Sequence, residues 1–214
     1  RDLHLSLRRQ RQIFIRDRYL TTMTRIIHEH RGTIDKYMGD AIMAFWGAPV
    51  GDSNHAHNAV EASIAMLSQL KKLQIDFKER GWPPIRIGIG LNTGDMNVGN
   101  MGSEFRMAYT VLGDAVNLGA RLEGLTKLYG VDLIVSESTA RAVPDLLYRE
   151  LDRVRVKGKD KPVTIYEPIG RHKNINNAVR EEIRIYQQAL YHYRQPVSYT
   201  HLRAHETDSY IVFR

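Results

Sequence analysis

The 214-residue sequence contains no cysteine, which excludes a disulfide scaffold, a cysteine-ligated zinc site and thiol catalysis. No apolar run approaches the roughly 20 residues that a membrane-spanning helix needs, so the sequence predicts no transmembrane helix in this chain. The chain does not begin with methionine, and Arg1-Asp2 starts no signal peptide. We therefore expect the chain to be a fragment whose true N-terminus lies upstream.

The remaining composition is that of an ordinary globular chain, with 43% hydrophobic and 26% charged residues. Its length suits one domain, or one domain with an appendage. The 31 basic and 24 acidic residues give a net charge of +7. Such a balance suits nucleic acid, anionic lipid or nucleotide phosphates, or simply a basic solvated surface. Aromatic residues do not interleave the basic clusters, as a single-strand-binding groove would require.

Hydrophobic periodicity and turn residues predict alternating helices and strands. Helices are predicted over residues 3–30, 53–80, 115–129 and 177–194, the second capped by Asp52 or Ser53. Strands are predicted over residues 33–38, 41–46, 85–91, 96–98, 133–135, 148–156 and 163–168, with a glycine-dotted loop after residue 98. Gly39-Asp40 reads as a hairpin turn, and 96–98 as the partner of 85–91. This order predicts an α+β sandwich, a mainly antiparallel sheet with helices on its face.

Three polar clusters contain residue types that suit nucleotide chemistry. Asp40 at a tight turn suits Mg²⁺, or serves only as a turn residue. Asn117 and Arg121 lie four residues apart on a predicted helix and share a face. There they can stabilise charge on a ribose and a phosphoryl group, or lie exposed with no such role. The lysines of the loop 157–161 suit a triphosphate, or a solvated turn.

Four sequence blocks, taken together and in their order along the chain, indicate a family more specifically than any single cluster does. These blocks are GTIDKYMGDAIMAFWGAP (32–49), IRIGIGLNTGDMNVGNMGS (85–103), YTVLGDAVNLGARLEGLTKLYG (109–130) and ELDRVRVKGKDKPVTIYE (150–167). Together they resemble the class III nucleotidyl cyclase catalytic domain, the family of adenylyl and guanylyl cyclases. The resemblance covers about residues 1–170. It is strongest to bacterial adenylyl cyclases in which this domain follows a membrane-bound sensor region.

The resemblance implies a role for each matching residue. Lys36 and Thr110 match the pair that reads the purine. A lysine at the first position favours ATP, whereas guanine-specific relatives carry an acid there and typically a cysteine at the second. Asp40 matches the second of two metal-binding aspartates. Asn117 would orient the ribose, and Arg121 would steady the transition state.

One implied role stays open between two residues, because either Lys157 or Lys159 would hold the terminal phosphates. The sequence also departs from the family pattern. The family's first metal aspartate lies in a strand before the first helix, and this chain begins after that strand. The resemblance therefore implies a ferredoxin-like βαββαβ-type sandwich with its first strand missing, and a fragment that is inactive by itself.

The implied reaction converts ATP to 3′,5′-cyclic AMP and pyrophosphate with two Mg²⁺ (or Mn²⁺) ions per site. The site would lie between the two subunits of a homodimer. No nucleic acid is expected as a partner. Only upstream regions of the protein would attach it to a membrane, and this domain would lie on the cytoplasmic face. Three alternatives remain: a degenerate non-catalytic regulatory or dimerisation module, a guanylyl cyclase, and a nucleic-acid-binding domain.

The last part of the chain differs in character from the rest. Residues 171–195 are similar to the helical extension that such cyclases carry after the catalytic domain. Residues 196–214 lack helix or strand periodicity, and VSYTHLRAHET (197–207) resembles the translation of a sequencing-library adapter. We therefore interpret 196–214 as an artefact and give no metal role to its histidines.

Overall fold

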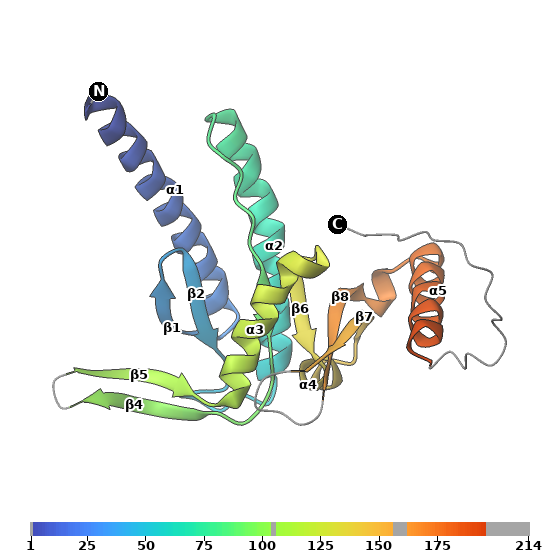
Figure 1. Ribbon diagram of the computed structural model, residues 1–214. Helices are drawn as coiled ribbons and strands as arrows, with labels where there is room; N and C mark the ends of the chain where they lie inside the picture. The colour runs from blue at the N-terminus through green and yellow to red at the C-terminus, as the bar shows by residue number, and fades with distance from the viewer. Residues whose placement is uncertain (1, 104–105, 156–161, 196–214) are drawn as a thin grey trace, which may run out of the picture. The chain divides into compact units, whose positions relative to one another are not determined.

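The computed structural model describes residues 2–103, 106–155 and 162–195, with side chains described from residue 13 onward except at residue 106. The chain divides into two compact units, Arg1–Asn174 and Ile175–Arg214. Its helices are α1 (Asp2–Glu29), α2 (His55–Glu79), α3 (Asp114–Tyr129), α4 (Glu137–Ala142), the short 3-10 turn η1 (His172–Asn174) and α5 (Asn177–Arg194). Its strands are β1 (Thr33–Met38), β2 (Ala41–Phe45), β3 (Ile89–Leu91), β4 (Asn97–Ser103), β5 (Arg106–Leu112), β6 (Leu133–Ser136), β7 (Leu146–Val154) and β8 (Val163–Arg171) (Figure 1).

The strands of the first unit are mainly antiparallel, which confirms the predicted α+β class. Within the described residues they form three separate sheets: the hairpin β1–β2, the hairpin β4–β5, and a four-stranded sheet of order β3-β6-β8-β7. Only the pair β3–β6 is parallel among the described pairings. The predicted mainly antiparallel arrangement is therefore confirmed, although the described strands are divided among three sheets.

One hydrophobic core lies under the two long helices. Met23, Ile26 and Ile27 of α1 and Leu70 and Phe77 of α2 are buried together. Partly buried residues in β1, in or just after β2, and in β3 or just before it pack against this core. They are Ile34, Ile42, Ala44, Trp46, Ile85, Ile87 and Ile89. These contacts fix α1 and α2 on the β1–β2 hairpin, so the predicted helical periodicity corresponds to real burial.

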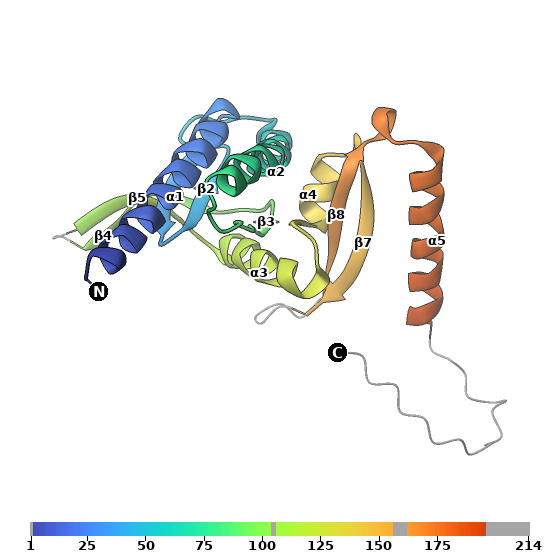
Figure 2. The same ribbon diagram turned by 90° about the horizontal axis from the view of Figure 1, so that it is seen from above.

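A second core joins α3 to the larger sheet. Leu118 and Leu122 of α3 are buried with Ile134 of β6, Leu151 of β7 and Ile165 of β8. Figure 2 shows β3 between α2 and α3, both of which contact it. The sheet therefore positions α3 from one side, with its N-terminal half beside the β4–β5 hairpin (Figure 1).

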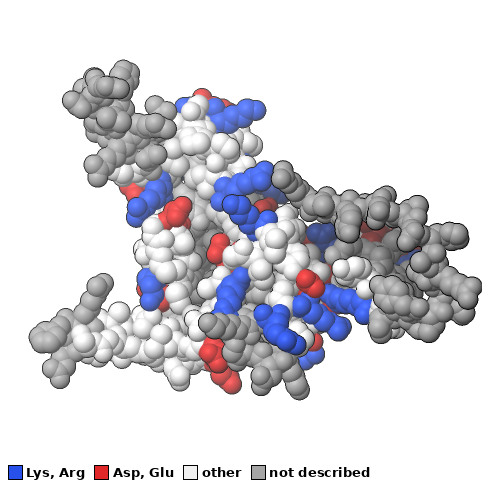
Figure 3. Space-filling view, in the orientation of Figure 1, with Lys and Arg blue, Asp and Glu red and all other residues white. Residues whose placement is uncertain are grey.

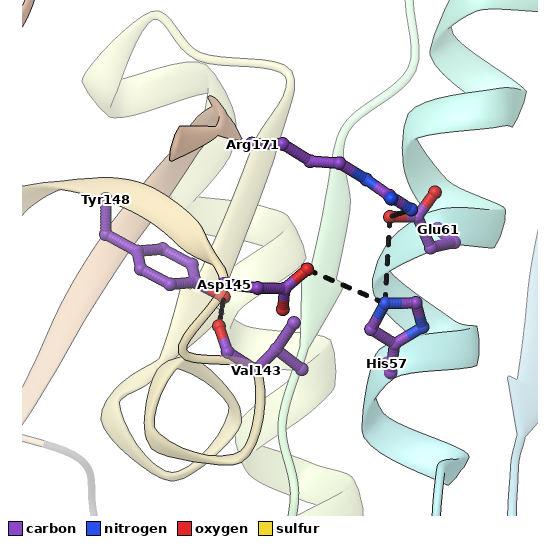
Figure 4. Close-up of polar contacts among 6 residues, drawn as sticks. All are labelled: His57, Glu61, Val143, Asp145, Tyr148 and Arg171. Atoms are coloured by element: carbon purple, nitrogen blue, oxygen red, sulfur yellow. Dashed lines mark hydrogen bonds and ion pairs between the residues drawn. The ribbon is translucent and has the colours of Figure 1, made fainter. Parts of the chain in front are cut away.

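Polar contacts join α2 to the end of the larger sheet that carries Asp145 and Arg171. His57 Nε2 lies 4.0 Å from Glu61 Oε1 and 3.8 Å from Asp145 Oδ2, which belongs to the loop between α4 and β7. Arg171, at the end of β8, donates from Nη2 to Glu61 Oε1 at 2.8 Å (Figure 4). These groups are partly exposed, so we treat them as a local fastening and not as a main source of stability.

The segment 97–103 differs from the prediction, which paired a strand over 96–98 with 85–91 and placed a loop after residue 98. Residues 97–103 form strand β4, which pairs along its whole length with β5, including Gly99 with Thr110. Figures 1 and 2 both show this hairpin as an arm that extends from the body of the unit. Glycine is a poor strand former, so the glycines at 99 and 102 concealed a strand that pairing with β5 imposes.

Two further predictions need correction. The strand predicted over 85–91 is assigned as a strand only over Ile89–Leu91, where β6 pairs with it. Helix α2 begins at His55 with Asn54 at its N-cap position, not Asp52 or Ser53. Asp52 nevertheless contributes, because its carboxylate accepts hydrogen bonds from the Asn54 backbone amide at 2.9 Å and from Asn58 Nδ2 at 2.8 Å.

The second unit contributes one amphipathic helix to the described chain, α5, over the residues predicted for it. The Asn176 side chain caps this helix by accepting a hydrogen bond from the Val179 backbone amide at 2.8 Å. Among the described residues, no helix has both the length and the apolarity that crossing a membrane requires. On the face drawn in Figure 3, Lys and Arg side chains lie in separate groups with acidic and uncharged surface between them.

Candidate active site

The structure brings together two residues that the sequence separates by 74 positions. Lys36, on β1, donates a hydrogen bond from Nζ to the hydroxyl oxygen of Thr110, on β5, at 3.4 Å. Thr110 is 9% exposed, whereas about half of the Lys36 side chain remains accessible. An ammonium group is thus held by a buried hydroxyl with donors still available to a ligand.

A third polar side chain, which the sequence motifs did not single out, lies beside this pair. The carboxylate of Asp35 is 3.2 Å from Lys36 Nζ, and its side chain is only 1% exposed. Aspartate is depleted in strands, so an aspartate inside the run 33–38 was the signal available in the sequence. The site therefore contains Asp35, Lys36 and Thr110.

Asp40 lies in the tight turn between β1 and β2 and is exposed. Gly39 precedes it with φ +69°, a left-handed conformation that glycine adopts without strain. The charge of Asp40 reaches Tyr19 of α1. Burial, with Asp40 as a second cause, raises the pKa of the Tyr19 hydroxyl to about 12.

Asp40 has the chemistry of a magnesium ligand, because Mg²⁺ takes oxygen donors and completes its shell with water and substrate phosphates. Among the described residues, no group of three or more His, Asp or Glu side chains is arranged to hold a metal ion. The described part of one chain therefore offers Asp40 as a single exposed carboxylate. That donor suits a metal ion whose other ligands come from the nucleotide, from water and from further carboxylates.

Asn117 and Arg121 lie one turn apart on the exposed face of α3, as their spacing predicts. The backbone amide of Asn117 donates to the Gly113 carbonyl at 3.3 Å, in the first turn of the helix. Helix α3 follows β5 directly, so the strand that carries Thr110 also sets where this helix begins. Lys157 and Lys159 lie outside the described residues.

A comparison with protein families identifies the region that contains these residues. The model for the adenylate and guanylate cyclase catalytic domain matches residues 14–167. This range includes Lys36, Asp40, Thr110, Asn117 and Arg121.

Curated relatives match the same region. Adenylate cyclase 1 of Rhizobium meliloti is 33% identical over 159 residues, covering 74% of this chain and 24% of that protein. The adenylate cyclase of Anabaena cylindrica is 40% identical over 162 residues, covering 72% of this chain and 31% of that protein. The chain thus matches about a quarter of the length of the first relative and just under a third of the second.

Solved structures share the fold. The crystal structure of an adenylyl cyclase from P. aeruginosa superposes with a TM-score of 0.69 at 31% identity, covering 78% of this chain and 86% of that one. The crystal structure of a guanylyl cyclase superposes with a TM-score of 0.69 at 33% identity, covering 77% of this chain and 83% of that one. Both base specificities are therefore represented among the similar structures.

Proposed function

Because the chain belongs to the adenylate and guanylate cyclase catalytic domain family, we propose that it is an adenylate cyclase catalytic domain. It would convert ATP to 3′,5′-cyclic AMP and pyrophosphate, as a lyase in cyclic-nucleotide signalling. The two curated relatives described above are named adenylate cyclases, which supports ATP as the substrate.

The observation that carries this proposal is the contact between Lys36 and Thr110. In our proposal these two side chains read the purine. The Lys36 ammonium group can only donate hydrogen bonds, so it suits the ring nitrogen N1 of adenine, which accepts. The N1 of guanine carries a proton and would oppose that donor. A base-reading pair of this composition therefore favours ATP over GTP.

Asp40 is the residue that would hold a divalent metal ion, Mg²⁺ or Mn²⁺. When bound, two such ions supply charge neutralisation for the triphosphate and acidify the ribose hydroxyl. The exposed position of Asp40 supports this assignment, because the carboxylate can reach a nucleotide without moving any buried element. We propose two such ions per site.

The remaining residues act on the sugar and the phosphates. Asn117 would orient the ribose, and Arg121 would stabilise the negative charge that builds up on the α-phosphate. Lys157 or Lys159 would bind the terminal phosphates. The 3′-oxygen forms a new bond to the α-phosphorus, and the bond from that phosphorus to the bridging oxygen of pyrophosphate breaks. The hydroxyl proton leaves to solvent.

We propose that the active unit is a homodimer with the site at the subunit interface. Exposed apolar side chains on β1 and β5 support this, and they are Tyr37, Met38, Met107, Tyr109 and Leu112. Exposed apolar side chains on two strands that contact each other favour a protein partner. We place the domain on the cytoplasmic side, where ATP is available, with any membrane attachment supplied by other parts of the protein.

The test is an assay of the full-length protein for cyclic AMP with Mg·ATP or Mn·ATP, with GTP as the competing substrate. We expect cyclic AMP from wild type and a loss of at least about 100-fold in kcat for Asp40→Ala, because metal-held charge stabilisation is worth several kcal/mol. Asp132→Ala, at an exposed position outside the site, is the matched control.

Two results would contradict the proposal. A purified dimer that forms no cyclic nucleotide with either metal would favour the non-catalytic regulatory module. A dimer that forms cyclic GMP in preference to cyclic AMP would make the domain a guanylate cyclase instead.

A further inference from the structure

The buried carboxylate of Asp35 is the starting point for one further inference. Its side chain is 1% exposed, yet neither of its oxygens accepts a hydrogen bond from any residue in the described chain. The contact with Lys36 Nζ at 3.2 Å is an ion pair whose alignment falls short of a hydrogen bond. Burial of a carboxylate without hydrogen bonds opposes folding, so a purely structural role does not account for Asp35.

The backbone is locally irregular at this residue. In the β1–β2 hairpin Ile34 pairs with Ala44 and Lys36 pairs with Met43, so Asp35 is the extra residue of a β-bulge. In a regular strand, neighbouring side chains point to opposite faces. A bulge changes the direction of the side chains next to it, and here Asp35 and Lys36 meet although they are adjacent in the sequence.

The Lys36 ammonium group therefore lies between two partners with different properties. Thr110 offers a neutral hydroxyl at 3.4 Å, and Asp35 offers a negative charge at 3.2 Å. Both partners are buried and confined by packing, whereas the Lys36 side chain is 49% exposed. A lysine side chain is long and flexible. Its two partners hold the ammonium group between the Asp35 carboxylate and the Thr110 hydroxyl.

We propose that Asp35 is a positioning residue for purine recognition, whose buried carboxylate holds the Lys36 ammonium group beside Thr110 before the nucleotide binds. This inference rests on the proposed function, because it assumes that Lys36 and Thr110 read the base. Asp35 touches neither the nucleotide nor the reacting atoms in this role. It acts by restricting where the Lys36 donors can be.

This role predicts that a change at Asp35 weakens ATP binding more than GTP binding and does not lower the folding stability. Ordering a free lysine side chain costs binding free energy that corresponds to roughly a tenfold loss in affinity. In Asp35→Asn the ammonium group loses its charged partner. ATP binding would then have to order the Lys36 side chain itself, which weakens the affinity for ATP. GTP, which we do not expect Lys36 to favour, would be affected less. Folding stability should stay the same or rise, because the buried charge is removed.

The experiment compares wild type, Asp35→Asn, Thr110→Ala and the double variant in the full-length protein. KM and kcat are measured for ATP and GTP, and the unfolding midpoint in urea is measured for each protein. For Asp35→Asn we expect kcat/KM for ATP to fall about tenfold, mainly through KM, with the ATP-to-GTP ratio falling by a similar factor. The double variant should lose less than the product of the two single losses, because both residues act on Lys36.

Asp132→Asn is the matched control, since this aspartate is exposed and lies outside the site. An unchanged ATP-to-GTP ratio in Asp35→Asn would overturn the proposal. So would a lower urea midpoint together with equal losses for both nucleotides, which would assign Asp35 a structural role.

Failure of the proposed function would look different, because wild type itself would then form no cyclic nucleotide. In that case the dissociation constants of fluorescent ATP and GTP analogues replace the kinetic constants. A selectivity for the adenine analogue that falls in Asp35→Asn would support the positioning role. Equal selectivity in both proteins would refute it.

Discussion

At the residue scale, Tyr19 and Asp40 interact although they belong to different elements. Tyr19 is 7% exposed in the core beneath α1, and Asp40 lies in the exposed turn of the β1–β2 hairpin. Burial, and next the negative charge of Asp40, raise the pKa of Tyr19 to about 12. The Tyr19 hydroxyl therefore stays neutral in the folded chain over a pH range in which an unfolded tyrosine ionises.

The sign of the resulting pH dependence follows from this difference. An unfolded tyrosine loses its proton near pH 10, and folded Tyr19 keeps its proton up to about pH 12. The stabilisation is complete below pH 10 and is lost as the pH rises from about 10 to 12. We expect Tyr19→Phe to remove about 2–3 kcal/mol of the wild-type decrease in unfolding free energy across that range.

Urea unfolding at about pH 9 and about pH 12 measures this decrease. Tyr193→Phe, at an exposed position on α5, is the control and should reproduce the wild-type decrease. Equal decreases for Tyr19→Phe and wild type would show that Tyr19 does not contribute to the loss of stability over this pH range.

At the element scale, the position of α3 depends on glycines in and beside β3. A Cβ atom added at Gly90 would lie 2.2 Å from the Glu123 backbone nitrogen and 2.4 Å from the Gly119 carbonyl oxygen. One added at Gly88 would lie 2.0 Å from the Thr126 hydroxyl oxygen. The helix that carries Asn117 and Arg121 therefore rests directly on the strand backbone.

We expect Gly90→Ala to lower the unfolding free energy by about 2–3 kcal/mol, because backbone atoms of α3 must move to admit the methyl group. Gly124→Ala, in the same helix, is the matched control. An added Cβ there meets nothing within 4 Å, and alanine is the better helix former, so stability should rise by up to about 1 kcal/mol. Urea midpoints for both variants give the comparison, and equal midpoints would contradict the close approach of α3 to β3.

At the scale of the whole molecule, we propose that each site of the dimer takes Asp40 from one chain and Arg121 from the other, so that Asp40 and Arg121 of one chain act in different sites. Neither Asp40→Ala nor Arg121→Ala alone should form cyclic AMP at a substantial rate. Mixing the two inactive proteins in equal amounts should restore about a quarter of the wild-type activity. Half of the dimers are then mixed, and each of these has one intact site out of two.

Subunit exchange followed by a cyclic AMP assay measures this restoration. A mixture of Asp40→Ala with Asp40→Ala/Arg121→Ala is the control and should stay inactive, because every site then lacks Asp40. If mixing the two single variants restores nothing, both residues act within one site of one chain, and the shared interface is wrong.

Much of the element order was predictable because its signals are local. The bounds of α3 and α5 agree with periodicity and capping residues to within one position. Gly39-Asp40 forms the predicted turn because glycine adopts its φ of +69° without strain. The cap of α2 was misassigned, because Asp52, Ser53 and Asn54 are all good cap residues and the local sequence does not choose among them.

Part of the candidate site was likewise predictable from the sequence, and part was not. Its residue types and spacings came from the sequence, as did the shared helical face of Asn117 and Arg121. The pairing of Lys36 with Thr110 came only from the family resemblance, because the contact joins β1 to β5 across residues that no periodicity connects. Asp35 was missed for a related reason, since only the paired register of β1 and β2 reveals the bulge that turns it toward Lys36.

The family, much of the order of elements and most of the candidate site residues follow from the amino-acid sequence, because they depend on composition, short motifs and local conformational preference. The arm formed by β4 and β5, the close approach of α3 to Gly90 and the buried carboxylate beside Lys36 become visible only in the folded chain. Such features arise from contacts between segments far apart in the chain. Their free energy comes from packing and burial, which no local pattern contains.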